Sequence, residues 1–537
     1  TGSQLALETL QLTSNGGDVL TVAGGIKDIV TLEGIDLSMN ADIIDLEQTL
    51  QSFGMQMTQL PSGIGKSEFL AEVKGKPETL AFTANVKAMR AAMEVSGTLT
   101  DAVTMPRVGD LTLRLQHPNY VELARLYQPS FSSGVAIRKN FDIFASMSRK
   151  GNIYTFSQLQ AAIGPTSIKG DVITDVSGEK PEITAALEIT DMPIDALLGI
   201  QSGSGKTQPD RQAQDVRWSR NAINTVFLHK VNIALKATAN SLSYGNWNFK
   251  NAGINLALKD GNLDIKQLDG GLYGGHAALT GVLKSSAKPR QPISFAGDII
   301  VQDVDLEDFV RSFSGSRLVN AKGPVSLNAS IQTTGLSPAA LVFDLSGKGS
   351  ASGKDLVFEG FDLERLSRAL AEPSSSFTQN FSRLMDASLQ GGTTRFDTLD
   401  GAYTITEGVI RLDKMDLTGA AADVITRGTI SLPLWSLDLE STVQLKEPED
   451  APSLRASFKG PIDKPAQTFG QNAMQQYFQK QLEGVVLNPL LESLEKKGVI
   501  PGGFLGGAKQ PAAQPQSQPD IPEADQPAEQ EDVPVQD

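Results

Sequence analysis

The chain repeats one short phrase five times: an apolar residue, an acidic residue, and then one or two helical turns rich in leucine. The acidic residues are Asp45, Glu122, Asp195, Asp305 and Asp362. Each copy ends a stretch in which apolar and polar residues alternate, as they do in a half-buried strand. The sequence therefore predicts repeated β-units, each closed by a short helix whose first N–H groups are capped by the acid.

The five acids are unevenly spaced, which excludes a solenoid with a fixed coil but allows a long sheet extended unit by unit. Glycine supplies 50 of the 537 residues, and only 20% of the residues are charged. This composition, with Val, Ile, Leu and Thr in alternation, favours a β-rich protein. The predicted fold is mainly β: an elongated, curled antiparallel β-sheet groove of repeated β-units, followed by C-terminal amphipathic helices.

The sequence pattern divides the chain into five regions. Residues 1–200 contain the upstream β-units, and residues 201–215 are rich in Ser, Gly, Gln and Pro, which predicts a linker or long loop and a boundary there. Residues 216–470 form a second β-region. Residues 471–507 predict amphipathic helices. Residues 508–537 consist largely of Pro, Gln, Ala and acidic residues, which predicts a disordered acidic tail.

The clearest hairpin lies in the second β-region. Ile254, Leu256 and Leu258 alternate with polar residues, the pair Asp260-Gly261 follows, and the alternation then resumes. An Asp-Gly pair between two alternating runs is a strong signal for a tight turn between antiparallel strands.

No pattern in the sequence indicates catalysis. The three histidines, His117, His229 and His276, are far apart and lack the paired spacing of a metal site. The segment from Ser202 to Thr207 resembles a phosphate loop, but Ile200 stands where that motif needs glycine. No nucleophile elbow is present. We therefore predict a protein that is not an enzyme and has no catalytic residue, metal or cofactor.

Charge and hydropathy bear on partners and location. The formal net charge of −15 argues against a nucleic-acid partner, because phosphate binding requires clustered Lys and Arg. The chain contains no cysteine, which suits a bacterial envelope compartment. It contains no run of about 18 apolar residues. Because it begins at Thr1 without methionine, we expect a fragment whose membrane anchor would precede residue 1.

A large apolar face along many strands has two competing uses. If two sheets close on each other, the face is a dry core. If one sheet stays curled and open, the face is a trough in which each buried CH₂ of a lipid contributes about 0.8 kcal/mol. The candidate lining residues are the alternating apolar residues of three strand-like segments: Leu111, Leu113, Leu115, Ile254, Leu256, Leu258, Leu432, Leu434, Leu437 and Leu439.

Several phrases in the second β-region carry a family resemblance. They are Leu272-Tyr273-Gly274-Gly275, Asp355 to Asp362 running into Leu363, Gly428 to Leu432, and the closing Gly460-Pro461-Ile462-Asp463-Lys464-Pro465. In this order they resemble the C-terminal region of AsmA-like proteins. The close match covers residues 225–470, and residues 4–200 resemble the family's upstream units more loosely.

The resemblance implies a bacterial protein that is anchored in the inner membrane and extends through the periplasm as a bridge-like lipid-transfer groove. It implies a role in phospholipid transport between the inner and outer membranes and in outer-membrane integrity. The expected partners are phospholipid acyl chains, together with inner- and outer-membrane proteins that the C-terminal helices would contact. The alternative is a structural or assembly scaffold for outer-membrane proteins, with a closed and dry sheet.

Overall fold

The structure is a computed structural model of the chain. It describes residues 4–52, 64–103, 107–127, 139–198, 217–314, 320–371 and 391–470, and the single positions 131, 388, 476, 477, 480 and 493. Residues 1–477 form one compact unit, and residues 478–537 form a second unit that lies almost entirely outside the described residues.

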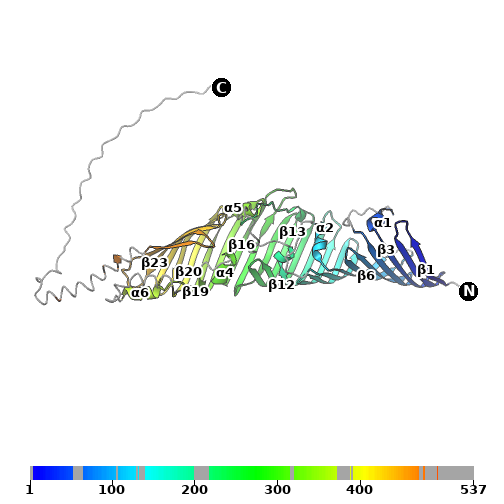
Figure 1. Ribbon diagram of the computed structural model, residues 1–537, viewed down its shortest axis with the longest axis horizontal. Helices are drawn as coiled ribbons and strands as arrows, with labels where there is room; N and C mark the ends of the chain where they lie inside the picture. Colours follow the sequence, from blue (N-terminus) through cyan, green and yellow to red (C-terminus); the bar gives the residue numbers. More distant parts are fainter. Residues whose placement is uncertain are drawn as a thin grey trace, which may run out of the picture. The chain divides into compact units, whose positions relative to one another are not determined.

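The first unit is built on strands that follow one another along the chain (Figure 1). Before residue 200 these strands are β1 (Leu5–Thr13), β2 (Val19–Asp28), β3 (Glu33–Ile43), β4 (Ser67–Lys76), β5 (Thr79–Ala88), β6 (Ala91–Thr100), β7 (Arg107–His117), β8 (Phe141–Lys150), β9 (Ile153–Ile163), β10 (Thr166–Asp175) and β11 (Glu182–Pro193). After residue 216 they are β12 (Asn232–Tyr244), β13 (Trp247–Lys259), β14 (Asn262–Leu272), β15 (Gly275–Lys284), β16 (Ile293–Asp305), β17 (Ala321–Lys322), β18 (Pro324–Gly335), β19 (Ser346–Glu359), β20 (Thr393–Thr406), β21 (Val409–Thr418), β22 (Ala422–Ser431), β23 (Ser436–Leu445), β24 (Leu454–Pro461) and β25 (Ala466–Gly470).

All 25 strands of the described residues belong to one sheet. Almost every strand pairs with its neighbours in sequence, and the short β17 pairs beside β18 on β19. The described strands at the two ends, β1 and β25, pair only with β2 and β24. The sheet is therefore open and mainly antiparallel, as the sequence predicts. One pair departs from this pattern: β11 and β12 are parallel.

Side-chain alternation explains why these segments form strands. In β7, Leu111, Leu113 and Leu115 are half-buried, whereas Thr112 and Arg114 between them are exposed. The predicted hairpin is also present: Lys259 of β13 pairs with Asn262 of β14 across Asp260 and Gly261. Both turn residues have positive φ, 50° and 80°, as a tight turn between twisted strands requires.

Short helices interrupt the strand order. They are α1 (Leu46–Ser52), α2 (Tyr120–Tyr127), α3 (Ile194–Leu198), α4 (Leu306–Ser314), α5 (Pro338–Asp344) and α6 (Leu363–Ala371), with a 3₁₀ turn, η1 (Val226–His229). Strand direction places α1, α2, α3, α4 and α6 at one long edge of the sheet, because β3, β7, β11, β16 and β19 all end there. We call this edge the helix rim. The opposite edge, formed by turns such as 29–32, 260–261 and 432–435 and by α5, is the hairpin rim.

The five repeated acids all lie on the helix rim, but in two different roles. Asp45, Asp305 and Asp362 immediately precede α1, α4 and α6, and one carboxylate oxygen of each accepts the N–H three residues on, at 2.8–3.1 Å. Glu122 and Asp195 differ from the prediction.

Those two acids lie inside the first turns of α2 and α3 rather than before them. Asn119 precedes α2, and its side-chain oxygen accepts the N–H of Val121. Glu122 instead pairs with Arg90 at 2.9 Å. Asp195 accepts the N–H of Gly245, next to β12. The sequence phrase, an apolar residue followed by an acid, does not show whether the helix begins before the acid or after it.

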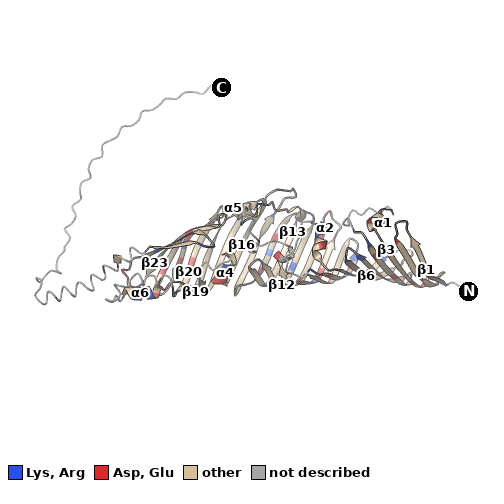
Figure 2. Ribbon diagram, viewed as in Figure 1, with Lys and Arg blue, Asp and Glu red and all other residues tan. Residues whose placement is uncertain are grey.

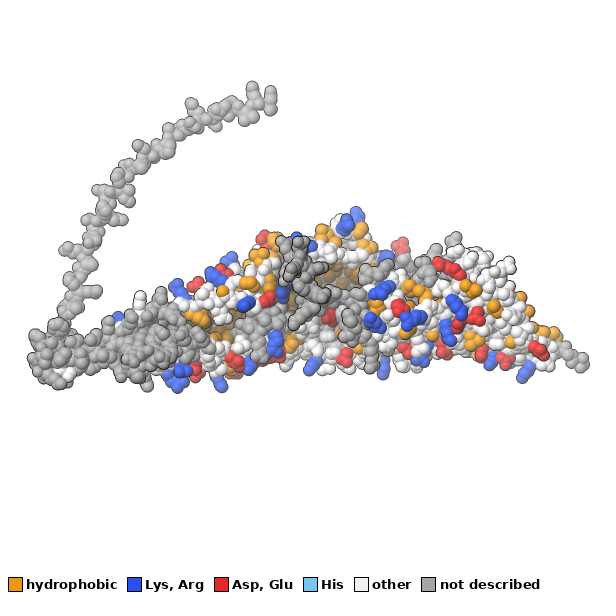
Figure 3. All heavy atoms as spheres, viewed as in Figure 1, with side chains coloured by type: hydrophobic (Ala, Val, Ile, Leu, Met, Phe, Trp, Pro, Cys, Tyr) orange, Lys and Arg blue, Asp and Glu red, His pale blue; other side chains and the backbone are white. Residues whose placement is uncertain are grey.

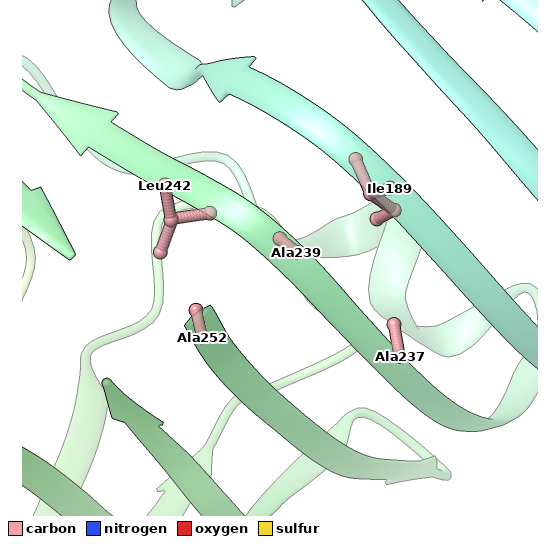
Figure 4. Packing of buried hydrophobic residues seen from close by; sticks show 5 residues of the cluster. All are labelled: Ile189, Ala237, Ala239, Leu242 and Ala252. Atoms are coloured by element: carbon pink, nitrogen blue, oxygen red, sulfur yellow. The ribbon is translucent and has the colours of Figure 1, made fainter. Parts of the chain in front are cut away.

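The predicted boundary at residues 201–215 lies outside the described residues, and the strands on either side of it pair directly. A packed cluster covers this junction (Figure 4). It contains Ile189 from β11, Ala237, Ala239 and Leu242 from β12, and Ala252 from β13, each less than 10% exposed. The predicted C-terminal helices, 471–507, and the acidic tail, 508–537, also fall almost wholly outside the described residues.

A second packed region lies where α6 covers β19 and β20. Leu356, Leu366 and Phe396 are at most 1% exposed, and the Phe358 ring stands edge-on to Phe396 at a centroid distance of 5.5 Å. The leucines at 363, 366 and 370 form the buried stripe of α6. The leucines that follow Asp362 therefore pack onto the sheet.

Candidate functional site

One face of the sheet is apolar from β1 to β24. Residues that pair directly across two strands point to the same face, so the strand registers define rows that run across the sheet. The central row begins with Leu10, Val22, Met39, Ala71, Ala84, Val95 and Leu113 on β1 to β7. It ends with Leu439 and Phe458 on β23 and β24, before Gln467 on β25.

The central row continues across the parallel junction. From β9 to β14 its members are Leu159, Gly170, Leu187, Ala237, Ile254 and Leu268. Between β11 and β12 the residue pairs run in register from Glu182–Asn232 to Pro193–Ser243. The apolar face is therefore continuous on both sides of residues 201–215.

The apolar row on each side of the central row includes other predicted lining residues. Leu111, Leu256 and Leu437 lie in one, and Leu115 lies in the other. Leu113, Ile254 and Leu439 are in the central row itself. Leu258 is on the same face nearer the hairpin rim, where it is 6% exposed.

The other two predicted lining residues lie elsewhere. The sequence interpretation placed Leu432 and Leu434 in a strand, but β22 ends at Ser431 and β23 begins at Ser436. Leu432 and Leu434 occupy the turn between them on the hairpin rim, and Leu434 is 79% exposed. Pro433 lies between them and lacks the N–H that a ladder position would need.

The few polar groups on this face are satisfied locally. Thr426 and Ser441 pair across β22 and β23, and their hydroxyls are 2.7 Å apart. The Tyr403 hydroxyl donates to the Asn328 carbonyl at 2.8 Å. Burial raises the pKa of Tyr403, so the phenol keeps the proton that it donates. These groups leave the surface able to contact apolar chains.

Large side chains fill the places where the floor has glycine. A Cβ at Gly349 would clash with the Tyr403 hydroxyl, so the Tyr403 side chain covers this residue. The Phe295 ring covers both Gly281 and Gly297, which pair with each other. Because glycine has no side chain, a neighbouring ring can lie against the backbone at these positions.

The opposite face is polar. Arg114 forms a two-point ion pair with Asp142, with N–O distances of 2.9 and 3.2 Å, and Gln116 donates to the same carboxylate. The Arg114 hydrogen bond is the main cause that lowers the pKa of Asp142. Lys, Arg, Asp and Glu are coloured in Figure 2. The two faces therefore differ sharply in polarity.

The sheet curls toward its apolar face. Ala239 and Ala252 on this face are 3% and 1% exposed, because larger side chains such as Ile194 and Phe249 pack against their cluster. Hydrophobic side chains are visible in the hollow between the two edges in Figure 3. The apolar face is therefore the floor of a groove.

A segment that the sequence analysis did not single out runs along the hairpin rim. This segment, residues 217–231, is called the strap. Arg217 lies over the Trp435 ring at 3.5 Å from its centroid, and Trp218 donates to the Leu432 carbonyl at 2.9 Å. Farther along, Ile223 donates to the Leu336 carbonyl, and His229 contacts Ser285.

The strap also reaches the helix rim. The Arg217 guanidinium donates to the Phe313 carbonyl in α4 at 3.1 Å and pairs with Asp463 on the hairpin rim at 3.5 Å. The two rims are therefore bridged by a single side chain at this point. The sequence contains only three tryptophans, and two of them, Trp218 and Trp435, pack edge-on here. The small number of tryptophans was the one feature of the sequence that could have drawn attention to the strap.

Within the part of the chain that the structure describes, no cluster of His, Cys, Asp and Glu is arranged to hold a metal ion. His117, His229 and His276 lie on β7, in η1 and on β15, and each contacts different residues. In the same described part, no helix is both long and apolar enough to cross a membrane.

The fold and its inner face define an open, single-layer β-groove with an apolar floor. Residues 26–415 match the family model described as the AsmA family. The chain belongs to the AsmA family.

A curated relative, Protein AsmA from Escherichia coli (strain K12), is 22% identical over 431 residues, which cover 78% of this chain. The match spans 64% of the relative's length. No solved structure matches the chain.

Proposed function

We propose that the groove binds phospholipid acyl chains and supports phospholipid transport between the inner and outer membranes. Membership of the AsmA family points to an envelope-related function of the lipid-transport type. One observation carries the finer proposal: the apolar rows continue from β1 to β24 without a charged residue.

Continuity matters because of the energetics of acyl chains. Each CH₂ that moves from water onto an apolar surface contributes about 0.8 kcal/mol of favourable free energy. An acyl chain that crossed a polar gap in the floor would lose this contribution at the gap. An unbroken apolar floor keeps the chain's free energy nearly constant along the groove. We place this activity in the periplasm, with the full-length protein anchored in the inner membrane, where it would contribute to outer-membrane integrity.

The proposed activity needs binding and no bond chemistry, so we propose a non-enzymatic protein. The scaffold alternative requires a closed, dry sheet. The open sheet with an accessible apolar face favours the lipid-binding function.

Native mass spectrometry of the purified chain tests the proposal. We expect phospholipids to co-purify and to remain bound after extensive washing, because the open apolar floor would otherwise face water. A chain that carries no lipid when purified from a bacterial host, and takes up none from phospholipid micelles, would contradict the lipid-binding proposal.

A further inference from the structure

Part of the hairpin rim exposes large apolar side chains. Leu434 in the β22–β23 turn is 79% exposed, and Phe343 in α5 and Phe227 in η1 are each 60% exposed. The turns are joined by backbone hydrogen bonds: Leu432 donates to Gly408, Gly408 to Leu345, and Ile223 to Leu336. These joined turns form one continuous surface, which we call the docking rim.

The docking rim is also basic. Its exposed cations are Arg220, Lys230, Lys288, Arg290 and Lys464. Among the described residues none of these five forms an ion pair with an acid. Acids are fewer on the same rim: Asp344 accepts the N–H of Thr334, Asp463 pairs with Arg217, and Glu407 is exposed in the β20–β21 turn.

The helix rim carries charges of both signs. Its acids include the repeated acids and Glu307, Asp308 and Glu364 in the first turns of α4 and α6, and the same two helices carry Arg311, Arg365 and Arg368 (Figure 2). The chain as a whole has a formal net charge of −15. A basic, apolar rim is therefore a local exception in an acidic protein.

We propose that the docking rim binds the surface of an anionic phospholipid bilayer. Exposed apolar side chains lower their free energy by entering the boundary between headgroups and acyl chains. Lys and Arg beside them are attracted to the negative surface potential of anionic lipids. The apolar residues stand on separate turns with cations between them, whereas the core of a protein–protein interface is depleted of charge.

This contact is distinct from the groove and does not depend on it. The floor would hold acyl chains, whereas the docking rim would hold the edge of the groove against a membrane. Backbone hydrogen bonds join the strap to α5, and the Trp218 side chain joins it to the β22–β23 turn, so the apolar residues and the cations are held together.

Flotation of the full chain with vesicles tests the proposal. We expect binding to vesicles of phosphatidylglycerol and phosphatidylcholine, weaker binding at high salt because counterions screen the charges, and little binding to pure phosphatidylcholine. The triple variant Arg220→Glu/Lys230→Glu/Lys288→Glu should bind at least about 100-fold more weakly, since each lost cation weakens binding about fivefold. The double variant Phe343→Ser/Leu434→Ser should bind about tenfold more weakly.

Two variants outside the docking rim serve as controls. Arg365→Glu/Arg368→Glu reverses two exposed cations on α6 of the helix rim, and Val30→Ser/Val103→Ser removes two exposed apolar residues from distant turns. Both should float like the parent chain.

Several outcomes would overturn the membrane-docking proposal: no binding to the anionic vesicles, equal binding to both vesicle types, or equal losses in test and control variants. Native mass spectrometry of the same variants separates this proposal from the groove. Co-purifying lipid with no flotation refutes only the docking rim, whereas flotation without co-purifying lipid refutes only the groove.

Discussion

Replacing Leu256 with aspartate is expected to lower lipid photocrosslinking from position 235 by at least about tenfold, because an unpaired carboxylate in an apolar site costs several kcal/mol. Leu235 pairs with Leu256 directly across β12 and β13, so a crosslinker there reports on the same part of the floor. Leu256 is only half-buried, so water can reach the new carboxylate when no lipid is bound, and the sheet should stay folded.

The neighbouring residue supplies a matched control for this prediction. Asn255→Asp adds the same charge one position away, on the opposite face, where it pairs with Lys236. It should leave the adducts unchanged. Undiminished adducts in Leu256→Asp, with unchanged circular dichroism, would show that the acyl chains do not lie on this row.

Replacing Phe396 with alanine is expected to reduce the free energy of unfolding of the region around β19, β20 and α6 by about 3–5 kcal/mol. Phe396 is 1% exposed and packs edge-on against Phe358, so its removal leaves a cavity that the curled sheet cannot readily close. Urea denaturation followed by hydrogen exchange in β19 and β20 measures the change.

Leu434→Ala is the comparison variant for stability, because this leucine is 79% exposed and should change the unfolding free energy by less than about 0.5 kcal/mol. Similar losses in the two variants would contradict the placement of the core under α6.

The sequence predicted the main features of the fold because alternation is a local property. The residues Leu111, Leu113 and Leu115 alternate with polar neighbours, and strands with that pattern must turn one face inward. The Asp260-Gly261 turn was predictable for the same reason, since its two positive φ angles suit Asp and Gly.

Features that depend on distant contacts were not predictable from the sequence. The parallel pairing of β11 and β12 depends on how the chain returns to the hairpin rim. The strap depends on Arg217 meeting Trp435 and Phe313, residues that are far apart in the sequence. Leu432 and Leu434 were also predicted wrongly. Their alternation with Pro433 matches a strand pattern, although the three residues lie in a turn.

The asymmetry of the two rims also emerges only in three dimensions. The repeated acids are visible in the sequence, but the direction of each strand places all five at one edge. The opposite edge, with its turns and exposed apolar residues, has no repeated sequence phrase that marks it.

The central claim is that acyl chains lie along the apolar floor, and photocrosslinking at paired positions tests it most directly. A crosslinking amino acid would replace Leu113, Ile254 or Leu439 on the floor, and its neighbours Thr112, Asn255 or Glu440 on the outer face. We predict lipid adducts at all three floor positions and at none of the outer ones. Adducts of equal yield on both faces, or at neither, would contradict the account.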